Sequence, residues 1–110
     1  MERIETTILR NLVFNEDFSR KVIPFIEPDY FEERKEKIIF EEVTKFKDKY
    51  NSAISIEALN IEIEGRTDLN ESEIKETRDI SNTLHDSAVE PQWLLDTTEK
   101  WCRDLSLIHI

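Results

Sequence analysis

Glycine, proline and cysteine are all scarce in this chain of 110 residues, which holds one glycine, three prolines and one cysteine. So few turn-forming residues disfavour a β-sandwich or barrel and favour helices joined by short polar loops. The lone Cys102 excludes an internal disulfide and a thiolate metal site built from this chain alone. No apolar run approaches the roughly 20 residues that span a bilayer. We therefore expect an all-α protein without membrane spans, and the cytoplasm is its default location.

Basic residues are also too few to balance the acidic ones. The chain has 15 Lys and Arg against 25 Asp and Glu, a formal net charge of −10. Phosphate binding requires positive surface, so we expect no direct binding of DNA or RNA, and a basic protein is the better partner. Six Phe, two Tyr and two Trp are enough to fold, so we expect one domain with a modest core.

Helical periodicity divides the chain into a compact bundle of about six helices. Ser55 as an N-cap favours a helix over 55–64, although Leu59, Ile61 and Ile63 also alternate like a strand. We expect the turn over 25–31 to tuck its aromatic side chains, Phe25, Tyr30 and Phe31, against the core. The expected helices are 2–14, 18–23, 32–50, 55–64, 70–84 and 91–110. The expected core is Ile8, Leu12, Ile39, Val43, Phe46, Leu59 and Ile80.

The last expected helix, opening at Pro91, carries an apolar stripe that runs toward the end of the chain. Such a stripe favours a partner, because aromatic residues dominate the energetics of interfaces. We therefore predict a globular helical domain over 1–90, followed by a C-terminal helix over 91–110 that begins a truncated helical hairpin. The predicted self-association residues are Trp93, Leu94, Trp101 and Leu105. An ordinary core role for the two tryptophans is the alternative.

The search for catalytic chemistry gives no site. The single glycine excludes a glycine-rich phosphate loop, so we expect no ATPase and no other enzymatic activity from these residues. We predict no catalytic, cofactor-binding or metal-binding residues. Cys102 and His109 lie seven residues apart, a weak basis for a metal or nucleophile role. The acidic pairs, including Glu32–Glu33 and Glu41–Glu42, are interpreted as solvated helix faces.

The order of these segments resembles the N-terminal domain of DnaB-type replicative helicases, especially those of large tailed phages. Ile4–Asn15 is similar to the family's first helix, and Pro28–Phe31 to the aspartate-aromatic step into its long helix. Ala53–Leu59 resembles the next short helix, and Trp93–Trp101 the helix that closes the globular part. Each motif is weak alone, and the order and spacing carry the resemblance to about Asp104. Bacterial members have a glycine-rich stretch where this chain has 66–70.

The resemblance implies an assembly role in DNA replication, in a bacterial or phage-infected cell. It implies a collar domain that helps ring assembly and contacts primase and a helicase loader, in a parent protein with an ATP-dependent motor. The residues alone leave a second hypothesis open: a free-standing small acidic adaptor or inhibitor that binds a basic partner.

Overall fold

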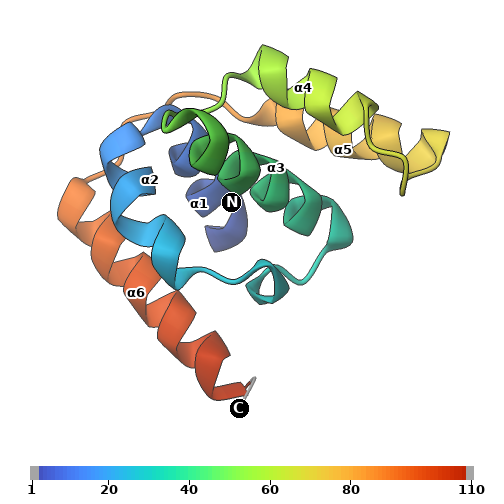
Figure 1. Ribbon diagram of the computed structural model, residues 1–110. Helices are drawn as coiled ribbons and strands as arrows, with labels where there is room; N and C mark the ends of the chain where they lie inside the picture. The colour runs from blue at the N-terminus through green and yellow to red at the C-terminus, as the bar shows by residue number, and fades with distance from the viewer. Residues whose placement is uncertain (1–2, 109–110) are drawn as a thin grey trace.

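A computed structural model describes residues 3–108, which form six α-helices and two short 3-10 helices, with no strand among them (Figure 1). The prediction of an all-α bundle is therefore confirmed. None of the helices in this described part combines the length and hydropathy needed to cross a bilayer. The helices are α1 (Ile4–Phe14), α2 (Glu16–Val22), η1 (Ile23–Phe25), η2 (Pro28–Tyr30), α3 (Arg34–Tyr50), α4 (Ile56–Glu64), α5 (Glu71–Thr83) and α6 (Pro91–Ile108).

Side-chain caps fix several of the helix ends. Asn15 and Ser55 each accept a hydrogen bond from the backbone N–H three residues ahead, at 3.1 Å, which opens α2 and α4. Asn70 and Glu73 form the reciprocal capping box that opens α5. Asn51 ends α3 in the left-handed region with φ 53°. These polar residues separate the helices in place of the missing glycines.

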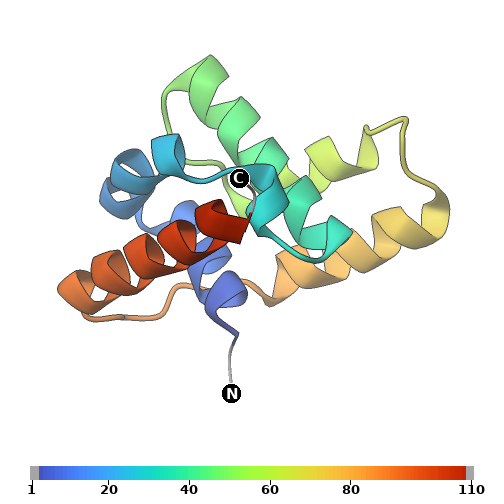
Figure 2. The same cartoon turned by 90° about the horizontal axis from the view of Figure 1, so that it is seen from below.

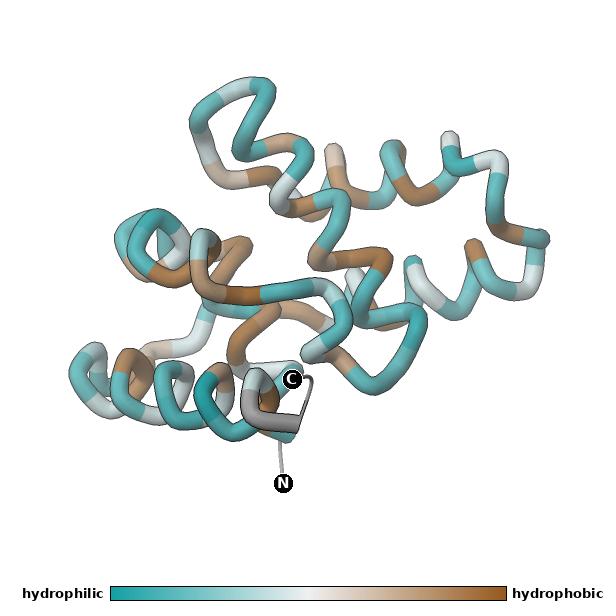
Figure 3. Tube along the Cα trace, turned by 60° about the horizontal axis from the view of Figure 1, so that its bottom comes forward, coloured by the Kyte–Doolittle hydropathy of each residue, from teal (hydrophilic) through white to brown (hydrophobic). Residues whose placement is uncertain are grey.

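The helices divide around α3, which lies at the centre of the molecule (Figures 1 and 2). The pair α4 and α5 packs on one side of α3, and α1 packs against it from another direction. Helix α6 lies away from α4 and α5 and contacts α2 and η2. Hydrophobic residues gather where these helices face one another, and hydrophilic residues cover the outer turns (Figure 3).

The predicted core is largely the observed one. Phe46 and Ile80 are partly buried at its edge, and the other five predicted residues are at most 1% exposed: Ile8, Leu12, Ile39, Val43 and Leu59. The choice of helix over strand for 56–64 is also confirmed. Leu59 and Ile63 are fully buried one turn apart, while Ile61 is 61% exposed on the opposite side.

The turn over 25–31 contains one wrong prediction. Phe31 is fully buried and Tyr30 is half-buried, as expected, but Phe25 is 72% exposed. Phe25 ends the 3-10 turn at 23–25 with its side chain outside the core, and Ile26 takes the inward position instead, with 5% of its surface exposed. A large aromatic side chain is therefore left on the surface beside α6.

Two buried charged side chains, Glu36 on α3 and Arg10 on α1, connect α1 to the rest of the fold. The Arg3 guanidinium donates to both oxygens of Glu36, at 3.2 and 3.4 Å, and Glu36 is 2% exposed. Burial raises the pKa of the Glu36 carboxyl above its ordinary value, and Arg3 opposes that rise. Arg10, which is also buried, donates to the carbonyl of Ser87 at 2.9 Å and so fixes the segment leading into α6.

Candidate protein-interaction surface

Helix α6 begins with an acidic cap and a proline. The Glu90 carboxylate accepts the backbone N–H of Trp93 at 2.6 Å, and the Leu94 N–H donates to the Glu90 carbonyl at 3.0 Å. Pro91 occupies the first turn, where its missing N–H leaves no bond unmade. The chain therefore starts α6 where the sequence predicts it.

The inward side of α6 packs into the common core. Leu94 is 2% exposed and Thr98 is 1% exposed. The Trp101 ring meets Phe31 at 5.1 Å and Tyr30 at 5.8 Å between ring centroids, the latter edge-on. Leu94 and Trp101 thus hold α6 onto the fold. The proposed division between 1–90 and 91–110 stays a prediction, because packing does not measure independent folding.

The four predicted interface residues do not share one surface. Leu94 has almost no exposed surface, Trp101 and Leu105 are half-buried, and Trp93 is 50% exposed. Trp93 lies one residue, about 100° of helical turn, away from Leu94. Their role in self-association stays a prediction, and in this conformation Trp93 offers the largest free area of the four.

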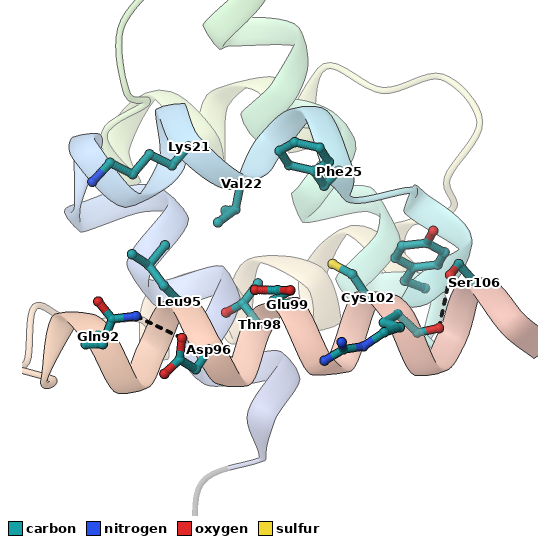
Figure 4. A pocket seen from close by; sticks show the side chains of 12 residues that line it. Lys21, Val22, Phe25, Gln92, Leu95, Asp96, Thr98, Glu99, Cys102 and Ser106 are labelled. Carbon is teal, nitrogen blue, oxygen red and sulfur yellow. Dashed lines mark hydrogen bonds between the residues drawn. The ribbon is translucent and has the colours of Figure 1, made fainter.

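A groove of about 750 Å³ runs between α6 and the α2–η1 segment (Figure 4). Val22 and Phe25 face Leu95 and Cys102 across it. Tyr30 also lines the groove. Phe25 is one of several large apolar side chains that the fold leaves exposed. The groove therefore places apolar side chains from two segments opposite each other, beside the buried face of α6.

Polar and charged side chains also line the groove. Thr98 lines the groove with its hydroxyl buried and without a hydrogen-bond partner in the described structure. Burial raises the pKa of the Cys102 thiol to about 11, which favours the neutral thiol over the more nucleophilic thiolate at neutral pH. Glu99 and Arg103 also line the groove, and neither is ion-paired within residues 3–108. The surface is suited to packing and ion pairing with another protein.

No other described residues assemble a reactive or metal-binding centre. The structure from Arg3 to Ile108 contains no group of three His, Cys, Asp or Glu side chains that could hold a metal ion. His85 lies exposed in the loop before α6, where its Nδ1 is 3.1 Å from the Thr83 carbonyl. His109, the residue paired with Cys102 in the sequence, lies outside the described residues.

The sequence interpretation missed a buried acid on α3. The pair Glu41–Glu42 was expected to be solvated, which holds for Glu41 but is wrong for Glu42, because its side chain is 1% exposed. Glu42 follows the core residues Ile38 and Ile39 by four and three positions, so it shares their inward face. That spacing was the available signal.

Comparison with known proteins supports one relationship. No family model matches the chain. The chain is similar to the DnaB-like replicative helicase of Enterobacteria phage T4, with 29% identity over 102 residues. The match covers 93% of this chain and 21% of the helicase, so the chain spans about a fifth of that relative's length. This similarity, with the helical fold, supports a relationship to DnaB-like helicases.

Proposed function

We propose that this chain serves as an N-terminal collar and assembly domain of a phage-type replicative helicase. In this role it promotes ring assembly and contacts primase and a helicase loader, while ATP hydrolysis belongs to a separate motor. The similarity to the phage T4 helicase and the segment order support the helicase context. The absence of a phosphate-loop motif from the sequence supports an assembly role over a motor role.

The charge distribution of the α2–α6 groove carries the self-association part of the proposal. Two copies with a net charge of −10 repel each other wherever their surfaces are acidic. The charged residues that line the groove cancel: Lys21 and Arg103 against Asp96 and Glu99. The groove is therefore a place where two copies meet without net repulsion while burying apolar surface.

The order of charges along α6 also suits pairing with a second copy. Two antiparallel copies of α6 bring Glu99 of one opposite Arg103 of the other, and a two-fold axis repeats the pair. Phe25 and Leu95 supply the apolar area between the two helices. Trp93, half exposed at the start of α6, lies outside the groove's lining.

Sedimentation equilibrium of the purified chain tests this surface. We expect a concentration-dependent dimer in the wild type and a shift toward monomer in Leu95→Asp. Burying the aspartate carboxylate in an apolar contact costs free energy, because the charge loses its hydration. The matched control is Ile61→Asp, which places the same charge on an exposed isoleucine of α4. A wild type that stays monomeric at high concentration, or equal effects of the two variants, contradicts the proposed surface.

A second experiment tests the helicase context against the acidic-adaptor alternative, which the net charge of −10 favours. The purified chain is mixed with the primase of a T4-like phage and analysed by co-sedimentation. The collar role predicts a complex that Trp93→Ala or Leu95→Asp weakens. A phosphate loop encoded in the same reading frame supports the collar role, whereas a stop codon directly after residue 110 in the natural gene supports the adaptor.

A further inference from the structure

An acidic cleft lies on the opposite side of the molecule from the α6 groove, between α3 and the loop that joins α4 to α5. It has a volume of about 500 Å³ and is lined by four acids and two bases. A smaller hollow of about 230 Å³ continues toward the end of α3. Both cavities are lined by Glu42, Lys45 and Glu62, so Glu42 and its covering lysine lie where the two meet. The remaining charged residues of the larger cleft are Glu41, Arg66 and Asp68.

The Glu42 carboxylate is poorly satisfied for a buried charge. Neither of its oxygens accepts a hydrogen bond within the described structure. Oε2 lies 2.7 Å from the Lys45 ammonium, a close ion pair without hydrogen-bond alignment, and 4.0 Å from Arg66. Oε1 has neither a hydrogen-bond partner nor an ion-pair partner among residues 3–108. Buried carboxylates normally receive several donors, so this one has capacity for a further cation.

The two cations beside Glu42 differ in how firmly they are held. Arg66 donates to both carboxylate oxygens of Asp68, at 3.0 and 2.8 Å, and to Glu41 at 3.3 Å. Arg66 is therefore engaged with its own loop. Lys45 has 64% of its side chain exposed and, within the described part of the chain, pairs only with Glu42, so it can swing into solvent and uncover Glu42.

An arginine side chain fits this cleft better than the alternatives. Its planar guanidinium can bond both oxygens of one carboxylate, which a lysine ammonium cannot do. The cleft carries four acids against two bases, so it attracts a further positive charge even with Lys45 in place. A metal ion is disfavoured, because no metal-holding group is present among the described side chains.

We propose that the cleft between α3 and the α4–α5 loop receives an arginine side chain of a basic partner protein, which displaces Lys45 and pairs with Glu42. This inference does not depend on the proposed function, because it applies equally to a collar domain and to a free adaptor. It uses a surface that the α6 groove does not share.

The test titrates the chain with a short glycine-spaced peptide that carries three arginines, and with its lysine counterpart, followed by ¹⁵N NMR. We expect the arginine peptide to bind more tightly and to shift the amides of 41–46 and 62–68. Glu42→Gln should weaken arginine-peptide binding about tenfold, because a charge-assisted bidentate contact is lost. Glu57→Gln is the matched control, since it removes the same charge from an exposed position on α4 and should change binding less than about twofold.

Lys45→Ala should change arginine-peptide binding in the opposite direction, and it tests the proposal if Glu42→Gln fails to fold. Removing the competing ammonium should strengthen arginine-peptide binding, whereas loss of a merely structural ion pair leaves it unchanged. The proposal is overturned if Glu42→Gln and Glu57→Gln weaken binding equally, or if shifts spread over the whole acidic surface. Equal binding of the two peptides also overturns it.

Discussion

The groove beside α6 and the acidic cleft beside Glu42 are two hollows of this molecule that differ in their lining. The groove is lined by apolar and polar side chains together with two acids and two bases, while the cleft is lined mostly by charged side chains with an acidic excess. Ion pairs are dense around the cleft. Arg34 and Arg66, for example, both reach Asp68.

This difference separates two kinds of partner for one acidic chain. A groove whose charges balance suits a second copy of the chain, because two acidic copies repel each other elsewhere on their surfaces. An acidic cleft suits a basic side chain and disfavours another copy of the same chain. The net charge of −10 thus favours a second copy at the balanced groove and a basic protein at the acidic cleft.

The largest expected effect comes from Phe31, which packs between α3, the helix that borders the cleft, and α6, the helix that borders the groove. Its fully buried ring lies 5.3 Å from that of Phe40 in α3 and 5.1 Å from that of Trp101 in α6. Phe31→Ala should lower the free energy of unfolding by about 3–5 kcal/mol, through lost burial and a cavity. Urea denaturation measures the change in the free energy of unfolding. A loss below about 1 kcal/mol would show that the Phe31 ring does not join α3 to α6.

A smaller effect separates the two tryptophans of α6. Trp101 packs on Tyr30 and Phe31, whereas Trp93 is 50% exposed. Trp101→Ala should cost about 2 kcal/mol of stability, less than a fully buried aromatic, and Trp93→Ala no more than about 0.5 kcal/mol. Thermal melts of both variants measure this. The reverse order would place Trp93 in the core and leave Trp101 for a partner.

The smallest expected effect is a pH dependence at the cleft. Hydrogen bonds from the Arg66 guanidinium lower the pKa of the Asp68 carboxyl to about 2. A depressed folded-state pKa contributes stability above the unfolded value of about 3.9, and that contribution is lost as pH falls toward 2. The melting temperature of the wild type should therefore exceed that of Asp68→Asn at pH 5 and converge with it near pH 2. A constant difference contradicts the assigned contact.

Most of the fold could be predicted from the sequence, because local signals set the helix ends. The N-caps Ser55 and Asn70 and the proline at 91 mark starts that the structure places within one residue. Helical spacing also identified buried residues such as Ile39 and Leu59. These signals act within a turn or two of the chain and need no tertiary information.

The surfaces were harder to predict, because they depend on which elements meet. Phe25 is exposed because Ile26, the next residue, takes the inward position. The spacing of Glu42 from Ile38 and Ile39 indicates the inward face of α3, but it does not show that Glu62 of α4 and the loop over 65–68 line the cleft beside Glu42. The groove joins α2 and α6, which lie some 70 residues apart in sequence.

The most direct measurement is a dilution series of ¹⁵N spectra of the wild-type chain. If two copies meet through the α6 groove, the amides of Val22, Phe25, Leu95 and Cys102 shift with concentration, and those of 41–45 and 62–68 do not. Shifts confined to the acidic cleft, or spectra that stay unchanged up to high concentration, contradict the account.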